Sequence, residues 1–222
     1  MLKTVLFDLD GTLVDTAPDL VRTLNKVRQE QGLVEMPYAD IRTAVSHGSK
    51  ELIIRGFELD EDDPQFEKLR LRLLKLYMDN MCTETKLFPH MANTLDALED
   101  MGLNWGIVTN KPKRMTEPLM TKLGLSSRAA CIVSGDSVEH SKPHPAPMYY
   151  ACKLAGSEPH NCLYIGDAER DIIAGREAGM ATVAALYGYI DDHENPQNWL
   201  ADGMIKQPAD LLPWLKQYIE KG

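Results

Sequence analysis

Short apolar runs that end in polar or glycine residues alternate with helical patterns over most of this 222-residue chain. Such runs are typical of buried parallel strands, and the segments between them are typical of the helices that cover a sheet. The alternation predicts an α/β fold with a doubly wound, Rossmann-like parallel sheet. Strands are expected at residues 3–7, 105–108, 131–133, 162–165 and 181–186, and helices at 93–101, 115–123, 145–155 and 171–178.

Residues 15–86 interrupt this alternation. Helical patterns are expected there at 17–31, 38–45, 50–56 and 64–80, without a strand between them. We interpret residues 15–86 as an inserted all-helical cap domain, and residues 1–14 and 87–222 as the core. Because the insertion leaves the core just after the first strand, it must stand above the carboxyl ends of the strands, where it can act as a lid.

Polar residues gather where the predicted strands end. Asp8 and Asp10 follow the first run, Thr109 and Asn110 follow the second, and Asp167 follows the fourth. In a parallel sheet these ends meet at one edge, where ligands bind. An isolated D-x-D pair would suit an ordinary acidic turn. At the mouth of a buried strand, however, unpaired carboxylates are costly unless a cation is present, so the pair indicates a metal site.

Hard oxygen ligands favour Mg²⁺ as this cation. Asp167 is the natural further ligand, because it also ends a strand. Asp171 lies one helical turn later on the same face, where it can reach the metal's waters or orient Asp167. Asp167 could also cap the following helix. Glu169 and Arg170 are expected at the surface, and Asp15 is expected to cap the helix that begins at residue 17.

Composition restricts the partners. The chain has 24 lysines and arginines against 33 aspartates and glutamates, a net charge of −9, and no basic face, which argues against nucleic acid. No apolar stretch approaches the roughly 18 residues of a membrane span, and no leader segment is apparent, so a cytoplasmic protein is expected. The four cysteines show no C-x-x-C spacing and are expected to be buried, reduced thiols. We expect a monomer or a homodimer.

Four short motifs follow one another along the chain. They are DLDGTLVD at residues 8–15, Thr109, Lys142 within SKPHP at residues 141–145, and GDAERD at residues 166–171. In this order they resemble the motifs of the haloacid dehalogenase superfamily, and the resemblance covers nearly the whole chain. The helical insertion after the first motif resembles the cap of the phosphoglycolate phosphatase branch. The resemblance implies a phosphoric monoester hydrolase that uses Mg²⁺.

The resemblance implies a role for each motif residue. Asp8 would be the nucleophile that forms an aspartyl-phosphate, and Asp10 would protonate the leaving alkoxide and then activate water. Thr109 would bind phosphoryl oxygens, and Lys142 would offset their charge. Outside the motif, Lys142 would suit an ordinary surface turn. The metal ligands would be Asp8, the backbone carbonyl of Asp10, Asp167 and Asp171.

Asp10 separates two reactions within the superfamily. A phosphate monoester releases an alkoxide that needs a proton, whereas a carbon–halogen bond releases a halide that needs none. Asp10 therefore favours phosphate transfer over dehalogenation. A sugar phosphomutase stays open as an alternative. A non-catalytic binding module is the other alternative, but it would keep a carboxylate cluster that destabilises the fold for no evident reason.

The substrate is expected to be a small phosphorylated metabolite, bound partly by the cap. The cap segment SHGSK at residues 46–50, together with Arg55, could bind an anionic group, or could be a helix junction with exposed charges. Lys111 could add local positive charge. The substrate-binding candidates are Thr109, Asn110, Lys142, His47, Gly48 and Arg114.

Four further stretches resemble bacterial phosphatases that act on N-acetylmuramic acid 6-phosphate in peptidoglycan recycling. They are residues 87–91, 103–112, 187–190 and 194–199. We therefore expect this amino sugar as the substrate, with phosphoglycolate as the alternative. In these last two stretches Trp199 is expected to pack on the core with either substrate, and the aromatic and asparagine-rich loop could still contact the amino sugar.

Overall fold

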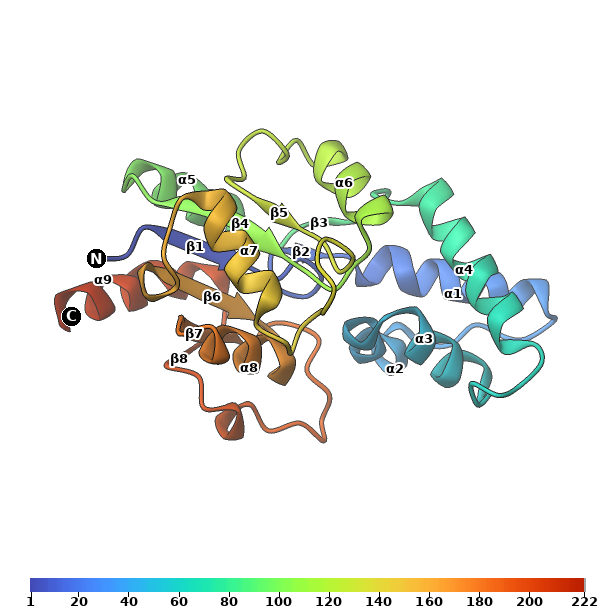
Figure 1. Ribbon diagram of the computed structural model, residues 1–222. Coiled ribbons are helices and arrows are strands. Elements are labelled where there is room, and N and C mark those ends of the chain that lie inside the picture. Colours follow the sequence, from blue (N-terminus) through green and yellow to red (C-terminus); the bar gives the residue numbers. More distant parts are fainter. Residues whose placement is uncertain (222) are drawn as a thin grey trace.

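The computed structural model describes residues 1–221 and places a six-stranded parallel sheet at the centre of the core (Figure 1). The strand order is β5-β4-β1-β6-β7-β8. The predicted α/β fold is confirmed, although the sequence pattern missed the short edge strand β8. The strands are β1 (Thr4–Phe7), β4 (Asn104–Val108), β5 (Ile132–Val133), β6 (Cys162–Gly166), β7 (Ala181–Ala185) and β8 (Gly203–Ile205).

The central strand β1 determines where a ligand can bind. It is fully buried and pairs in parallel with β4 on one side and with β6 on the other, so that Phe7 lies opposite both Ile107 and Ile165. The chain runs outward from β1 through β4 to β5, then crosses back to β6. This reversal leaves a crevice at the carboxyl ends of β1, β4 and β6.

Alternating side chains give the sheet two apolar faces. Val5 and Phe7 belong to one core cluster, together with residues of α5, α6 and α9. Leu6 and Tyr164 belong to the other, together with α7 and α8, which Figure 1 shows in front of the sheet. The helices are α5 (Met91–Asp100), α6 (Lys113–Lys122), α7 (Ala146–Ala155), α8 (Glu169–Glu177) and α9 (Leu211–Lys221).

The inserted segment forms a separate group of helices beyond the carboxyl ends of the strands (Figure 1). Its apolar residues pack together and continue the larger core cluster. The predicted helices are present, with the second divided into an α-helix and a 3-10 turn. They are α1 (Ala17–Glu30), α2 (Tyr38–Arg42), η1 (Thr43–His47), α3 (Gly48–Phe57) and α4 (Phe66–Asn80).

The chain enters and leaves the cap through a two-stranded antiparallel ribbon. Strand β2 (Val14–Asp15) pairs with β3 (Lys86–Leu87). The expectation that residues 15–86 contain no strand is therefore wrong at both ends, because the two crossings lie side by side and their backbones pair. The domain boundaries that we placed after residues 14 and 86 fall in this ribbon, and the division into two domains stays a prediction.

Asp15 does not cap α1. Thr16 is the residue that precedes the helix, and the Asp15 carboxylate instead accepts a 2.7 Å hydrogen bond from the hydroxyl of Tyr189. The prediction was wrong because the ribbon turns Asp15 toward a loop that is distant in the sequence.

Two composition-based expectations can be compared with the structure. Within residues 1–221, no helix is both long enough and apolar enough to cross a membrane. The four thiols, which all lie in the described part of the chain, are free. Three of them are buried, as expected, and Cys82 is partly buried.

Candidate active site

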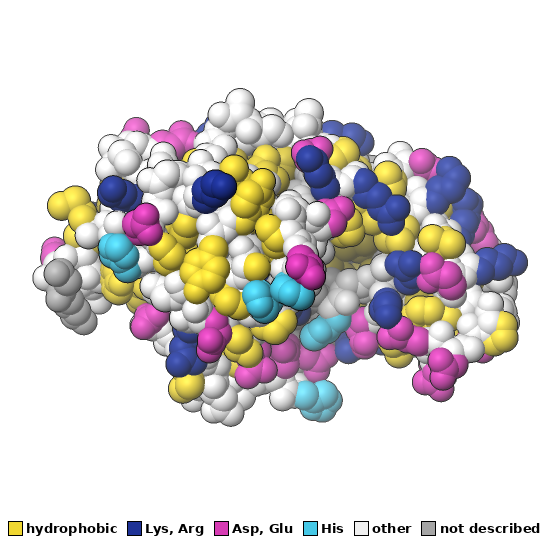
Figure 2. Space-filling model, in the orientation of Figure 1, with side chains coloured by type: hydrophobic (Ala, Val, Ile, Leu, Met, Phe, Trp, Pro, Cys, Tyr) yellow, Lys and Arg dark blue, Asp and Glu magenta, His cyan; other side chains and the backbone are white. Residues whose placement is uncertain are grey.

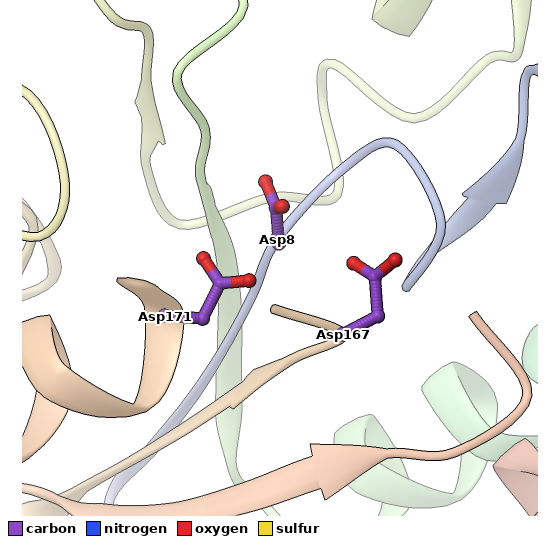
Figure 3. A group of neighbouring side chains, drawn as sticks. All are labelled: Asp8, Asp167 and Asp171. Atoms are coloured by element: carbon purple, nitrogen blue, oxygen red, sulfur yellow. The ribbon is translucent and has the colours of Figure 1, made fainter. Parts of the chain in front are cut away.

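Three aspartates form an acidic cluster at the carboxyl ends of β1 and β6 (Figure 3). Asp8 follows β1, Asp167 follows β6, and Asp171 lies in the first turn of α8. One carboxylate oxygen of each lies within 4.8 Å of those of the other two. Their exposed fractions are only 4%, 1% and 0%, so water does little to screen their mutual repulsion. The cluster therefore requires nearby positive charge.

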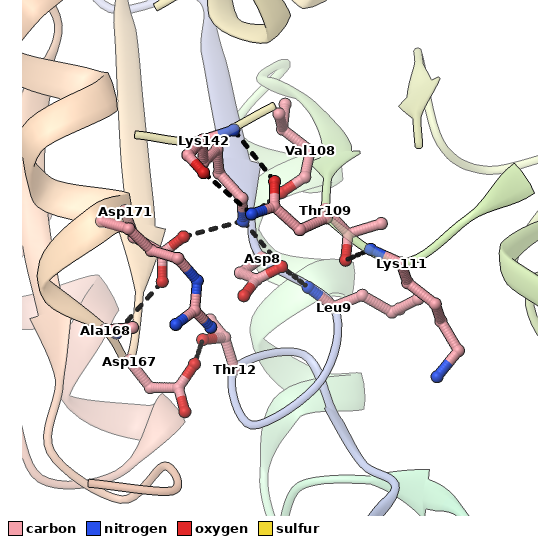
Figure 4. A network of polar contacts seen from close by, with 12 residues as sticks. Asp8, Leu9, Thr12, Val108, Thr109, Lys111, Lys142, Asp167, Ala168 and Asp171 are labelled. Atoms are coloured by element: carbon pink, nitrogen blue, oxygen red, sulfur yellow. Dashed lines mark hydrogen bonds and ion pairs between the residues drawn. The ribbon is translucent and has the colours of Figure 1, made fainter. Parts of the chain in front are cut away.

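Lys142 supplies part of this charge (Figure 4). Its Nζ lies 2.9 Å from Oδ1 of Asp8 and 2.7 Å from Oδ1 of Asp171. It also lies 2.9 Å from the carbonyl oxygen of Val108 and 2.8 Å from the hydroxyl of Tyr164. The side chain is completely buried, which excludes the surface-turn alternative. Four oxygen atoms within 2.9 Å of the ammonium group fix its position beside Asp8.

Asn110 holds the backbone of Lys142. Its Nδ2 donates to the carbonyl oxygen of Lys142 at 2.9 Å, and its Oδ1 accepts from the N–H of Lys142 at 3.0 Å. The loop that carries Lys142 is thereby attached to the end of β4. Nearby, Thr109 is buried, and its Oγ1 accepts a 3.1 Å hydrogen bond from the backbone of Lys111.

The Asp167 carboxylate is held by two contacts. Thr12 donates to Oδ1 at 3.0 Å, and the backbone N–H of Tyr189 donates to Oδ2 at 2.8 Å. Gly11 passes so close that a Cβ atom there would lie 2.2 Å from Oδ2, and its φ of +85° also favours glycine. The first motif therefore shapes the site through its glycine as well as through its acids.

Burial and repulsion both act on these carboxylates. Burial, together with the charges of Asp8 and Asp171, raises the pKa of Asp167 to about 7. Burial also raises the pKa of Asp8, and the neighbouring Lys142 opposes that shift. A cation bound among the three carboxylates would reverse these shifts, because it favours their ionised forms.

Asp171 takes the capping role that was considered for Asp167. Helix α8 begins at Glu169, and Ala168 is the residue before it. Oδ2 of Asp171 accepts a 3.0 Å hydrogen bond from the backbone of Ala168. The capping alternative for Asp167 is wrong because the helix begins two residues later. Asp167 therefore lies between the end of β6 and the start of α8, with its carboxylate in the cluster.

A cavity of about 430 Å³ opens between the core and the cap, with Asp8 in its wall. Figure 2 shows a hollow between these two parts, with lysine and arginine side chains on the cap side. Five lysine and arginine side chains line the cavity against two aspartates, so it is locally cationic in a chain of net charge −9. The five are Lys50, Arg70, Lys111, Arg114 and Arg170, the aspartates are Asp8 and Asp10, and His47 also lines the cavity.

Comparison with known proteins agrees with this geometry. The family model described as "Haloacid dehalogenase-like hydrolase" matches residues 5–185. The chain belongs to this family. It is similar to the N-acetylmuramic acid 6-phosphate phosphatase of Pseudomonas putida, with 42% identity over 210 residues that cover 95% of this chain and 94% of that protein. It is also similar to the phosphoglycolate phosphatase of Xanthomonas campestris pv. campestris, with 41% identity over 209 residues and 94% of each chain covered.

A solved structure extends the comparison to the fold. The crystal structure described as a predicted phosphoglycolate phosphatase from Haemophilus somnus superposes with a TM-score of 0.84. Its sequence is 31% identical, and the alignment covers 96% of this hydrolase and 98% of that chain. The family, the fold and the hydrolase class that the four motifs predicted are confirmed.

In this haloacid dehalogenase-like hydrolase, Asp10 carries an ion pair that the motif did not indicate. Its Oδ1 lies 2.8 Å from Nζ of Lys111 and accepts a 2.6 Å hydrogen bond from Oγ1 of Thr16. Burial lowers the pKa of Lys111, but the charge and hydrogen bond of Asp10, together with the neighbouring Tyr77, outweigh burial and raise it. Lys111 is thus a fixed partner of Asp10 rather than a general source of positive charge.

Arg170 is not a surface residue. It lines the cavity, and its guanidinium donates to the carbonyl oxygen of Ser46 at 2.7 Å and to its hydroxyl at 3.0 Å. The prediction was wrong because η1 of the cap lies over the first turn of α8 and covers this position. Glu169 is exposed, as expected.

Most of the predicted substrate-binding residues line the cavity, but Lys142 is buried against Asp8 and does not, and one cap candidate lies elsewhere. His47, Gly48 and Lys50 from the cap line it, as do Thr109, Asn110 and Arg114 from the core. Arg55 instead pairs with Asp191 at 3.2 Å and donates to Thr43 at 2.9 Å. It therefore joins the cap to the core instead of facing a ligand.

The stretch that was considered for amino-sugar contact has a structural role. Trp199 is buried against Ile172 and Ala184, which confirms the packing alternative. The hydroxyl of Tyr189 accepts the backbone N–H groups of Thr16 and Ala17 at 2.7 and 2.9 Å. Tyr189 connects the core to the start of the cap, a role that no local motif signals.

Proposed function

We propose that this hydrolase is a magnesium-dependent phosphatase that acts on a small metabolite through a phosphorylated Asp8. One observation carries the proposal. The Asp8 carboxylate lies in the wall of a cationic cavity, with Lys142 at 2.9 Å and two further buried aspartates beside it. A nucleophile, a fixed cation and an acidic metal site are thus adjacent, as transfer of a phosphoryl group requires.

The acidic cluster suits Mg²⁺. Its side-chain donors are carboxylate oxygens, which are the hard ligands that Mg²⁺ prefers. The raised pKa of Asp167 indicates that Lys142 alone does not balance the cluster. We assign the ion to Asp8, Asp167 and Asp171, together with the backbone carbonyl of Asp10. Bound Mg²⁺ would supply positive charge that offsets the charge of the phosphate group.

In the first proposed step, an Asp8 oxygen attacks phosphorus, and the ester P–O bond breaks. The electron pair of that bond passes to the leaving oxygen, which takes a proton from Asp10. Thr109 and Lys142 hold the phosphoryl oxygens during the transfer. Before this step, Asp10 leaves its ion pair with Lys111, takes up a proton from solvent water and turns its protonated carboxyl group toward the leaving oxygen.

In the second step, water attacks phosphorus of the aspartyl-phosphate, and Asp10 takes the proton from that water. The bond between Asp8 and phosphorus breaks, and its electron pair restores the carboxylate. The products are the alcohol and inorganic phosphate. Water as the final acceptor distinguishes this phosphatase reaction from that of a sugar phosphomutase.

N-Acetylmuramic acid 6-phosphate is the substrate that we favour, which would place the reaction in cytoplasmic peptidoglycan recycling. The names of the two relatives do not decide between the two substrates, because their sequence identities to this chain, 42% and 41%, are almost equal. The cavity of about 430 Å³ supports the larger molecule, because phosphoglycolate would leave most of it empty. Lys50 and Arg70, whose present partners Glu61 and Glu67 are exposed, would exchange them for the carboxylate that both molecules carry.

The test is phosphate release from N-acetylmuramic acid 6-phosphate and from phosphoglycolate, measured side by side with Mg²⁺ and with a chelator. We expect Mg²⁺-dependent turnover with a marked preference for the amino sugar. A preference for phosphoglycolate would establish the alternative substrate. Turnover that ignores the chelator, or none with any phosphate ester, would contradict the catalytic assignment.

A further inference from the structure

Tyr77 of the cap carries an unpaired polar group at the cavity. It lies on α4, is 1% exposed, and lines the cavity beside the core residue Lys111. Among the buried side-chain nitrogens and oxygens of residues 1–221, its hydroxyl is the one that lacks a hydrogen-bond partner. Leaving a buried hydroxyl unpaired is unfavourable, so this group is available to a ligand.

Other buried tyrosines of this chain show what a structural hydroxyl looks like. Tyr164 donates to the carbonyl oxygen of Val108 at 2.8 Å, and Tyr187 donates to the carbonyl oxygen of Thr12 at 2.9 Å. Each of these hydroxyls joins two parts of the fold. The Tyr77 hydroxyl makes no such hydrogen bond, and its polar neighbour is the Lys111 ammonium, which acts on the pKa of Tyr77 from beyond hydrogen-bond distance. The packing of the ring does not explain why the residue carries a hydroxyl.

The surroundings of Tyr77 connect it with the leaving group of the reaction. Nζ of Lys111 lies 4.8 Å from the centre of the Tyr77 ring and 2.8 Å from Oδ1 of Asp10. The phenol therefore lies in the corner of the cavity that contains the proposed proton donor to the leaving oxygen. Burial raises the pKa of Tyr77, so the hydroxyl keeps its proton and can donate it in a hydrogen bond.

We propose that Tyr77 is a specificity-determining residue whose hydroxyl donates a hydrogen bond to an oxygen carried by the leaving alcohol. The inference rests on the proposed phosphatase function and adds the group that recognises the alcohol. A hydroxyl, ring, amide or carboxylate oxygen of a sugar acid would serve as the acceptor. Because Tyr77 belongs to the cap and Asp10 to the core, the contact holds such an alcohol beside Asp10 when the cap covers the core.

The test is Tyr77→Phe, which removes only the hydroxyl. We compare kcat/KM for N-acetylmuramic acid 6-phosphate, for phosphoglycolate and for phenyl phosphate, whose leaving group has no oxygen besides the ester oxygen. For the better of the first two substrates we expect a loss of about tenfold to a hundredfold, and for phenyl phosphate a change below about twofold. The melting temperature should not fall, because no hydrogen bond within the protein is removed.

Tyr149→Phe is the matched control, because Tyr149 is 49% exposed on α7 and lies outside the site. It should leave all three rates unchanged. Equal losses on all substrates, no loss on any, or a lower melting temperature of Tyr77→Phe would overturn the inference. Turnover of phenyl phosphate by the wild type with Mg²⁺ tests the proposed phosphatase function alone. Its absence would contradict that function, whereas the comparison with Tyr77→Phe tests only the role of the hydroxyl.

Discussion

The backbone N–H of Tyr189 donates a 2.8 Å hydrogen bond to Oδ2 of Asp167. The hydroxyl of the same tyrosine accepts the first backbone N–H groups of the cap, from Thr16 and Ala17. The guanidinium of Arg42 lies 4.8 Å above its ring. One residue therefore joins the acidic cluster to the point where the chain enters the cap.

Tyr189→Phe should separate these two connections. The variant keeps the backbone contact with Asp167 but leaves two N–H groups of the cap and the Asp15 carboxylate without their partner. We expect a loss of about 1–3 kcal/mol in the free energy of unfolding, with Mg²⁺ affinity nearly unchanged. Denaturant unfolding and Mg²⁺ titration check this, with the half-exposed Tyr218→Phe as the control. Unchanged stability would show that the hydroxyl does not stabilise the start of the cap.

Lys142→Met should impair both activity and stability. The substitution removes the ammonium that lies between Asp8 and Asp171 and leaves buried charge without a partner. We expect kcat to fall roughly 10²–10³-fold. The free energy of unfolding without metal should fall by about 3–5 kcal/mol. Steady-state kinetics and denaturant unfolding measure the two effects. Retention of wild-type kcat would exclude Lys142 from the reaction.

The raised pKa of Asp167 predicts a dependence of stability on pH in metal-free protein. Its carboxyl has a pKa of about 7 in the folded protein, against 3.8 as the ordinary value. The folded state therefore binds the proton of Asp167 more tightly than the unfolded state does. The contribution of this carboxyl group to the free energy of unfolding falls as pH rises from about 4 to about 7, and it stays low above that. Without metal, Asp167→Asn should be more stable than wild type at about pH 8 and nearly equal to it at about pH 4.

Melting curves with and without Mg²⁺ check this prediction. Mg²⁺ should raise the melting temperature of the wild type at about pH 8 and have little effect on Asp167→Asn. Glu169→Gln, at an exposed position of the same segment, is the control and should behave as the wild type does. A metal-free Asp167→Asn that is less stable than the wild type at about pH 8 would show that the carboxylate is not destabilising there.

Gly11→Ala should disable the metal site through a steric effect. The added Cβ would lie 2.2 Å from Oδ2 of Asp167 and would displace it. Gly124→Ala is the matched control, because Gly124 also has a positive φ, but a Cβ atom there would meet nothing within 4 Å. We expect both variants to lose some stability, and only Gly11→Ala to lose Mg²⁺ affinity, measured by titration. Equal Mg²⁺ affinity of the two variants would contradict this account.

The parts of the site that follow from local pattern could be predicted from the sequence. Asp8, Thr109 and Asp167 each end an apolar run, and the carboxyl ends of parallel strands meet at one edge. The same pattern predicted the core helices α5 to α8. It missed β8, which has only three residues and lies at the edge of the sheet.

Contacts between distant segments could not be predicted in this way. Arg170 is covered by Ser46, which lies 124 positions earlier, and Tyr189 binds Thr16 across 173 positions. Tyr77 lies in an apolar helical pattern that is also typical of ordinary core residues. The roles of these residues depend on how the cap lies over the core, and no short motif records that arrangement.

The most direct test of the central claim is the covalent state of Asp8 during turnover. Wild type and Asp8→Asn are mixed with substrate and Mg²⁺, quenched with acid, digested and analysed by mass spectrometry. We predict one phosphoryl group on the peptide that contains Asp8 in the wild type, with no adduct and no turnover above background in Asp8→Asn. Hydrolysis by Asp8→Asn at the wild-type rate would contradict the proposed mechanism.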